Sequence, residues 1–217
     1  MSYKLVNPLI NTWSQANWQN ASDTILFAGL SAQQPFHTMA VQMQDVRDNG
    51  ADSKFLWGWK RDMYDYLQVH GEQLYDKLME IKTTKYGKHG VLERDKQMMF
   101  ELTKVPGLGV VKAGFVMQLM FGRVGCVDVH NLKRLRSVKL TDLSFPKSLR
   151  DETKLKKIEN YVQICKGNNS SEKLWNKWCE VLTYKQCNRG RFKSGFDVSM
   201  FHLTALLGKK RFGGLTG

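Results

Sequence analysis

The sequence predicts an all-α fold, and three observations support this prediction. Apolar residues recur at helical rather than alternating spacing through most of the 217 residues. Segments with the pattern of a strand are few and short. Proline, glycine and small polar residues stand where a helical segment should begin or end. We therefore expect one helical unit over residues 1–217.

The helical segments follow one another with short breaks between them. Ser22 or Asp23 is expected to start the first helix, and Pro35 suits the first turn of the second, which Asn49-Gly50 should end. Residues 138–152 contain Pro146 and several Ser, Thr and Asp residues, so they are predicted to form a loop. The predicted helices cover residues 22–32, 35–48, 54–69, 72–84, 93–103, 110–121, 152–165, 171–184 and 195–208.

The positive charge of the chain is concentrated in its second part. The formal net charge is +13, yet residues 1–130 hold 14 Lys and Arg against 13 Asp and Glu, and residues 131–217 hold 19 against 7. Such a surplus favours a polyanionic partner, because neutralising phosphates dominates the affinity for nucleic acids. A basic surface that only aids solubility is the alternative.

The sequence disfavours a membrane protein, a protein with a signal peptide and a protein with a cysteine-bound metal. No apolar run approaches the ~20 residues of a membrane-spanning helix, and the N-terminal region lacks the pattern of a signal peptide, so we expect an intracellular protein. The four cysteines, at positions 126, 165, 179 and 187, include no C-x-x-C pair. This spacing suits neither zinc nor an iron–sulfur cluster, so free thiols and no metal site are predicted.

Residues 104–122 contain a tight turn between two helices. In the segment Lys104-Val105-Pro106-Gly107-Leu108-Gly109, proline ends the preceding helix and two glycines flank one apolar residue. A helix from Val110 to Phe121 should follow, closed by Gly122. The first N–H groups of this helix lack partners and lie at its positive end, which suits one phosphate of a nucleic-acid backbone. A plain turn between helices is the alternative.

Three pieces of this sequence, taken in order, resemble the helix-hairpin-helix DNA glycosylase superfamily. Leu30-Ser31-Ala32-Gln33 is similar to a helix end of the endonuclease III branch. The segment from Leu102 to Gly109 resembles the hairpin, and Val127-Asp128-Val129-His130 resembles the segment that carries the essential aspartate. Gly125 precedes that aspartate, but the proline common there is missing. Asp128 stands 19 positions after Gly109 and 95 after Gln33, which fits the family.

The resemblance covers residues 20–140 and implies a two-lobed helical fold with the active site between the lobes. A helical lobe would span residues 20–125, with the hairpin at 102–122, and a basic helical portion would span 126–217. The implied activity is excision of a modified or damaged base, after it has been flipped out of double-stranded DNA. The protein is expected to be a monomer without a cofactor, although the hairpin could hold a monovalent cation.

Asp128 occupies the position at which the family keeps its catalytic carboxylate. Breaking an N-glycosidic bond builds positive charge on the sugar, and a carboxylate beside the sugar stabilises this charge and can orient the attacking water. The alternative is a helix N-cap, a position that aspartate commonly takes. One residue could serve both purposes.

Lys112 is the residue that bears on strand cleavage. Bifunctional relatives carry a lysine two residues after the second glycine of the hairpin, where this chain has Val111. Lys112 lies one residue later, and one step along a helix turns a side chain by about 100°. We therefore predict that Lys112 misses the sugar and is solvated or faces a phosphate, and that the enzyme has no lyase activity.

The resemblance implies further contacts with DNA. Gln33 matches a glutamine that helps to fill the gap left by the flipped base, and His130 matches a residue near the DNA backbone, although a surface or capping histidine is the alternative. The predicted DNA-binding residues are Gln33, Pro106, Gly107, Leu108, Gly109, Val111, Lys112, His130, Lys133 and Arg134.

Aromatic side chains are candidates for holding a flipped base, because bases stack on rings. Trp57 belongs to Trp57-Gly58-Trp59, within a predicted helix where at least one ring should join the core. Phe36 follows Gln34 and Pro35 and is the better candidate for a wall or wedge. The predicted base-pocket residues are Gln34, Phe36 and Trp57, and the sequence does not indicate which base fits.

Two other functions remain open at this point. A phage-type branch of the same fold is thought to modify thymines by displacing pyrophosphate, in which case Asp128 would activate an amine. Helix-hairpin-helix elements also occur in proteins that only bind DNA. The products formed on DNA separate the first alternative from excision, and the effect of Asp128→Asn separates the second.

Overall fold

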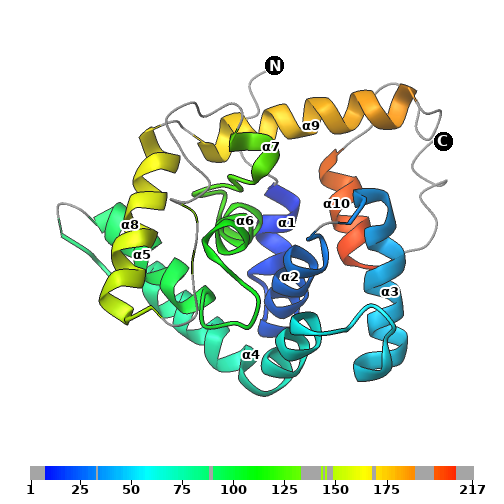
Figure 1. Ribbon diagram of the computed structural model, residues 1–217, viewed down its shortest axis with the longest axis horizontal. Helices are drawn as coiled ribbons and strands as arrows, with labels where there is room; N and C mark the ends of the chain where they lie inside the picture. The colour runs from blue at the N-terminus through cyan, green and yellow to red at the C-terminus, as the bar shows by residue number, and fades with distance from the viewer. Residues whose placement is uncertain are drawn as a thin grey trace.

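The computed structural model describes residues 8–32, 34–87, 90–132, 143, 145, 149–167, 170–188 and 198–208. All regular structure within these residues is helical, which confirms the predicted all-α class (Figure 1). The α-helices are α1 Pro8–Ser14, α2 Trp18–Leu30, α3 Met39–Asn49, α4 Trp59–Thr83, α5 Gly90–Leu102, α6 Val110–Phe121, α7 Val129–Leu132, α8 Asp151–Gly167, α9 Ser170–Asn188 and α10 Val198–Leu206; the short 3-10 helices are η1 Phe36–Thr38 and η2 Gly50–Asp52.

Helix α2 begins earlier than the sequence predicts. Its N-cap is Asn17, whose side chain accepts a hydrogen bond from the backbone N–H of Asn20 at 2.9 Å. Ser22, one of the two predicted starting residues, is instead buried within the helix. Asparagine caps a helix as well as serine or aspartate does, so the first suitable residue before the apolar positions sets the start.

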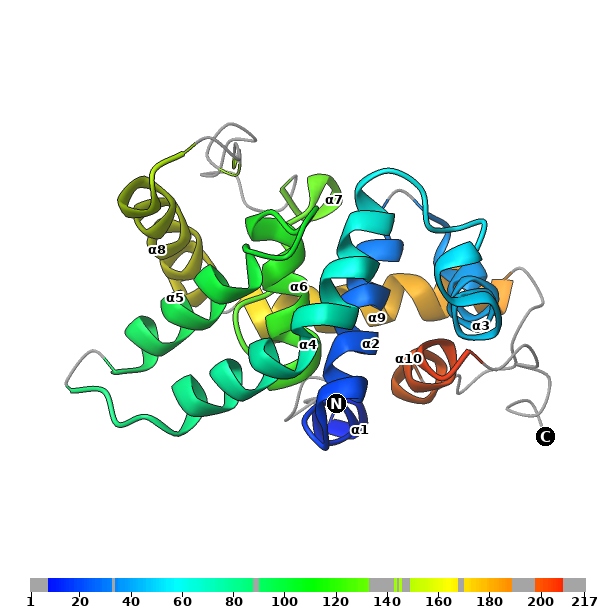
Figure 2. The same cartoon turned by 90° about the horizontal axis from the view of Figure 1, so that it is seen from below.

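Helix α4 replaces the two helices predicted over 54–69 and 72–84. Gly71 does not interrupt it, because this glycine lies where α4 crosses α2 (Figure 2). A Cβ atom at Gly71 would stand 2.6 Å from Ser22 Oγ, and one at Gly29 of α2 would stand 2.2 Å from Met63 of α4. Glycine therefore permits the two helices to approach closely, and packing outweighs its low helix propensity.

Helix α6 is the central helix of the described structure. It packs against α1, α2 and α5 (Figure 1). Most of its own residues are apolar and buried. A helix that is apolar on all sides is stable only when it is enclosed by others. Its burial fixes both of its ends, namely the hairpin turn before Val110 and the loop after Gly122.

Helices α9 and α10 complete the molecule on the side of α2 and α3. Helix α9 contacts both α8 and α10, and α10 packs against α1 and α3. His202 of α10 is fully buried, with its ring centroid 4.9 Å from that of Trp175 and 4.5 Å from that of Trp178. This aromatic cluster anchors the part of α9 that faces the centre of the molecule. In the described part of the chain, no helix is both long enough and apolar enough to cross a membrane.

Candidate functional site

The helix–turn–helix predicted around Pro106 is present at the predicted place. Helix α5 ends at Leu102, α6 begins at Val110, and Gly122 closes α6 in the left-handed conformation with φ of 64°. The N-cap of α6 is Gly109, which has no side chain that could accept a hydrogen bond from the first amide groups of the helix. Within the described structure, the amide N–H groups of Gly107, Gly109 and Val110 meet no acceptor. The turn therefore offers several backbone donors at the positive end of a helix.

The side chains of the turn face inward rather than outward. Leu108 is 3% exposed and belongs to the core. Gly107 has a φ of +79°, and a Cβ atom there would stand 2.1 Å from the indole ring of Trp59. Glycine is thus required by this packing as well as by the backbone conformation. Gly107 and Leu108 are both predicted to contact DNA, and in this turn only their backbone atoms can do so.

The loop after α6 is held in place by one buried tyrosine of α8. The hydroxyl group of Tyr161 donates a hydrogen bond to the carbonyl oxygen of Gly125 at 2.7 Å and accepts one from the N–H of Val127 at 3.0 Å. A Cβ atom at Gly114 of α6 would stand 2.5 Å from the Gly125 carbonyl oxygen. The loop therefore lies directly on α6, clamped between Gly114 and the tyrosine.

Two further features define the course of this loop. Arg123 forms a bidentate ion pair with the buried carboxylate of Asp95 on α5, with nitrogen–oxygen distances of 2.6 and 2.8 Å. Val124 has a φ of 63°, which a β-branched residue rarely adopts. Backbone strain of this kind persists only where the surrounding structure enforces it. The loop is thus a fixed support for the residues that follow.

Asp128 ends this loop, caps α7 and lines a pocket. Its Oδ1 atom accepts a hydrogen bond from the N–H of Asn131 at 2.9 Å, which is the contact of an N-cap. Oδ2 has no hydrogen-bond partner among the described residues. The two alternatives considered for this aspartate are therefore compatible: one oxygen caps the helix, and the other remains available.

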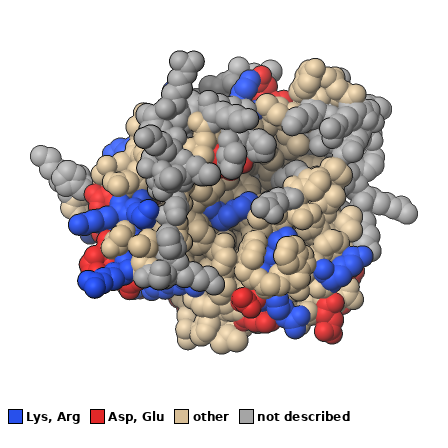
Figure 3. Space-filling model, in the orientation of Figure 1, with Lys and Arg blue, Asp and Glu red and all other residues tan. Residues whose placement is uncertain are grey.

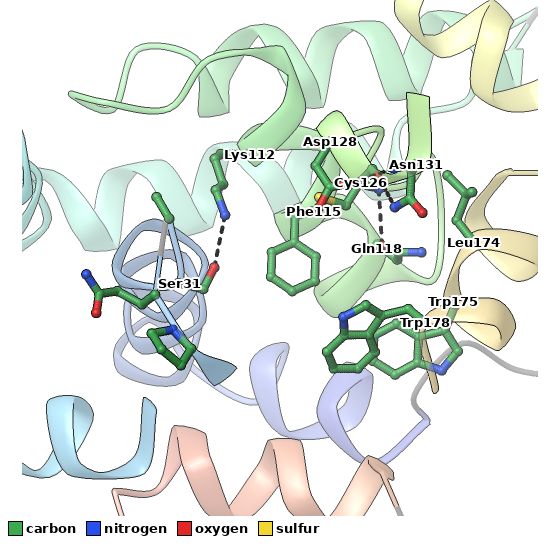
Figure 4. A pocket seen from close by; sticks show the side chains of 13 residues that line it. Ser31, Lys112, Phe115, Gln118, Cys126, Asp128, Asn131, Leu174, Trp175 and Trp178 are labelled. Atoms are coloured by element: carbon green, nitrogen blue, oxygen red, sulfur yellow. Dashed lines mark hydrogen bonds between the residues drawn. The ribbon is translucent and has the colours of Figure 1, made fainter. Parts of the chain in front are cut away.

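The pocket beside Asp128 has a volume of about 620 Å³. Figure 4 shows Asp128 and Lys112 along one side, Phe115 between them, and the two indole rings of α9 on the opposite side. The volume lies within the range of about 300–1,000 Å³ that is usual for small-molecule sites. The lining residues are Ser31, Ala32, Gln34, Pro35, Lys112, Phe115, Gln118, Cys126, Asp128, Asn131, Leu174, Trp175 and Trp178.

Lys112 is half-buried and lines the pocket. Its Nζ atom donates a hydrogen bond to Ser31 Oγ at 3.0 Å and lies 5.6 Å from the centroid of the Phe115 ring. Lys112, Phe115 and Gln118 recur at a spacing of three and share the face of α6 that lines the pocket. Val111, one position away, is not among the lining residues. Lys112 therefore lies on the pocket face of α6, and the expectation that its amine misses the sugar stays a prediction.

The other predicted site residues have different outcomes. Gln34 lines the pocket, whereas Trp57 is 60% exposed, precedes α4 and does not line it. Pro106 is half-buried in the turn. Gln33, Lys133 and Arg134 lie outside the described residues, as do the side chains of Phe36 and His130.

The aromatic wall contains residues that the sequence did not single out. Trp175 and Trp178 lie one helical turn apart on α9, with ring centroids 5.5 Å apart. Their i,i+3 spacing, together with Leu174, was a visible sign of an aromatic helix face. What the sequence could not show is that this face lines the same pocket as α6 and Asp128.

Cys126 is enclosed by two carboxamide side chains. Its N–H donates to Gln118 Oε1 at 3.2 Å, and its carbonyl oxygen accepts from Asn131 Nδ2 at 2.7 Å. Burial raises the pKa of the Cys126 thiol to about 12, so the thiolate is essentially absent at neutral pH. Cys126 lines the pocket, but a thiol with a raised pKa is a weak nucleophile at neutral pH. In the described part of the chain, no three His, Cys, Asp or Glu side chains are grouped to hold a metal ion.

Comparison of the chain with protein-family models, curated proteins and solved structures found no match. The functional interpretation therefore rests on the residues and on the geometry of the pocket.

Proposed function

We propose that this protein is a DNA glycosylase that binds a flipped, modified or damaged base and hydrolyses its N-glycosidic bond. The observation that carries the proposal is that Asp128 and the first turn of α6 share one pocket. The turn before α6 offers free amide donors for a backbone phosphate. A nucleotide held by that turn can extend its base and sugar into the pocket beside the carboxylate.

The walls of the pocket suit a planar base. Phe115 and Trp178 present aromatic rings on different sides of the cavity (Figure 4). Stacking between such rings is the usual way in which enzymes hold a base outside the duplex. Lys112 and Asp128 supply charge at the other side of the cavity, where the sugar would lie.

In the proposed reaction, the carboxylate of Asp128 stabilises the positive charge that develops on the deoxyribose as the base departs. Oδ1 is fixed by the N–H of Asn131, which holds the carboxylate in one orientation before the substrate arrives. Oδ2 is available to face the sugar or to orient the attacking water. This preorganisation depends on the loop that Tyr161 clamps.

The DNA partner and the two-lobed arrangement are part of this proposal. The surplus of positive charge after residue 130 supports a polyanionic partner. In the proposed arrangement, the pocket lies between the lobe that carries the hairpin and the basic portion that contributes α9.

The proposal is tested by incubating the protein with duplexes that each carry one candidate base, followed by mass spectrometry of base and strand. The expected products are a free base and an abasic site, and Asp128→Asn should lower the rate by about 10²-fold or more. Asp151→Asn, which changes an exposed aspartate in the first turn of α8, is the matched control and should react at the wild-type rate.

The same assay separates the alternatives. An intact strand with a heavier base would identify a base-modifying transferase, and binding without any product would leave only a DNA-binding module. Borohydride tests the predicted absence of lyase activity: we expect no trapped protein–DNA adduct. An adduct that disappears in Lys112→Ala would show that Lys112 attacks the sugar.

A further inference from the structure

The cavity beside Asp128 is larger than a flipped nucleoside requires. An apolar cavity of about 150 Å³ is enough to hold one benzene ring. On that scale a two-ring purine takes up at most about 300 Å³ and its sugar about 150 Å³. The cavity itself has a volume of about 620 Å³. A bound base and its sugar would therefore leave space for roughly one further ring.

The spare volume lies towards the border that α9 forms. In the proposed reaction the sugar lies at Asp128, and Figure 4 shows Trp175 and Trp178 on the opposite side of the cavity. Leu174 and Trp175 are almost fully buried, so the cavity ends deep in the molecule on this side. A base that extends from the sugar towards α9 would direct a substituent into this deep end.

The wall that α9 contributes is fixed by a buried aromatic cluster. The ring centroid of His202 on α10 lies 4.9 Å from that of Trp175 and 4.5 Å from that of Trp178. It also lies 6.2 Å from that of Phe27 on α2, and both His202 and Phe27 are fully buried. Closely packed side chains of this kind do not shift freely. The two indole rings therefore stay against α10, and the spare volume is a fixed part of the fold.

The deep end of the cavity is uncharged. Among the described lining residues only Lys112 and Asp128 carry charge, and the ammonium group of Lys112 bonds the residue that follows α2. The carboxamides of Gln118 and Asn131 bond the backbone of Cys126. Figure 3 shows a hollow in this face of the molecule, with uncharged side chains along its right border. Water gains few hydrogen bonds beside apolar walls, so an apolar group that displaces it gains affinity.

We propose that the substrate base carries an uncharged, ring-sized substituent, which binds against Leu174 and Trp175 at the deep end of the cavity. This assignment rests on the proposed function and names its class of substrate. The aromatic wall stacks on the substituent, while Asp128 acts on the sugar at the other end.

Four duplexes test the proposal, carrying N6-benzyladenine, O6-benzylguanine, N4-benzylcytosine or 5-benzyluracil, each compared with its unsubstituted parent. The benzyl ring stands on a different edge of each base, so the set covers the directions in which a substituent can point. At least one benzylated base should be released with a kcat/KM about tenfold or more above that of its parent, because its ring becomes buried. Mass spectrometry of base and strand measures the release.

The variant Leu174→Phe fills the deep end and should lower the ratio of benzylated to parent release about tenfold. Val69→Phe, which enlarges a side chain of α4 that is 71% exposed, is the matched control and should keep the wild-type ratio. A ratio that Leu174→Phe leaves unchanged would overturn the proposal, as would parents that are all released faster than their benzylated forms.

The free benzylated deoxynucleosides separate this proposal from the proposed function. At least one of them should raise the melting temperature of the wild type more than its parent nucleoside does. Such stabilisation without release of any base from DNA would support the substituent site and refute the glycosylase. Release of a small modified base, with no benzylated base or nucleoside bound, would overturn the substituent site and leave the proposed function intact.

Discussion

At the scale of single residues, Asp128 meets two demands with one carboxylate. Its Oδ1 atom caps α7, and its side chain lines the pocket. Asparagine is as good an N-cap as aspartate, because its side-chain oxygen accepts the same hydrogen bond. The substitution Asp128→Asn should therefore leave the melting temperature nearly unchanged while it removes the charge. A large loss of stability would indicate instead that the carboxylate is mainly structural.

Tyr161 links the fold to the site, and Tyr161→Phe should show this link. The change removes both hydrogen bonds of the buried hydroxyl group and leaves the Gly125 carbonyl and the Val127 amide without these partners. We expect the free energy of unfolding to fall by about 1–3 kcal/mol. Base release should slow more than duplex binding weakens, because the loop that carries Asp128 becomes less fixed. Urea unfolding and single-turnover kinetics measure the two effects.

The control for this variant is Tyr184→Phe, since Tyr184 of α9 is 69% exposed. It should be as stable as the wild type. Equal stability of Tyr161→Phe and the wild type would contradict the role of the hydroxyl group.

At the scale of elements, the hairpin depends on the contact between Gly107 and Trp59. In Gly107→Ala, the methyl group would overlap the indole ring, and the residue would keep a left-handed conformation. We expect a loss of about 1–3 kcal/mol of stability, together with weaker DNA binding. Gly87→Ala is the matched control, because a Cβ atom there meets nothing within 4 Å. Thermal unfolding compares the two variants, and similar melting temperatures would refute the argument.

The helices also show which features of the fold can be predicted from the sequence. Helix α6 and the turn before it follow from local signals, namely proline and glycine before the helix and Gly122 after it. The continuity of α4 through Gly71 does not follow from such signals, because it depends on how closely α2 approaches. The sequence likewise does not show that Lys112 lines the pocket and Val111 does not, because the partners of that face come from distant segments.

At the scale of the whole molecule, His202 makes stability depend on pH. Burial lowers its pKa from 6.5 to about 3 in the folded state, and Nδ1 bonds the carbonyl oxygen of Val198 at 2.7 Å. Below pH 6.5 the unfolded chain takes up a proton that the folded protein excludes. Stability should therefore fall by about 1.4 kcal/mol per pH unit towards pH 3, in addition to the effect of the carboxylates.

His202→Phe removes this contribution and keeps an aromatic ring among the tryptophans. Urea unfolding between pH 4 and pH 7 should give a shallower acid slope for the variant than for the wild type. Parallel slopes would show that His202 does not exclude the proton.

The sequence by itself determined the helical class, the hairpin turn, the cap at Asp128 and the excess of positive charge. These features depend on residues close together in the chain, where periodicity, proline, glycine and capping chemistry act directly. The tertiary structure alone decided that α9 brings Trp175 and Trp178 to the pocket, that Lys112 and Asp128 line the same pocket, and that the side chain of Lys60 is largely buried. These arrangements arise from packing between segments far apart in sequence, which local patterns do not encode.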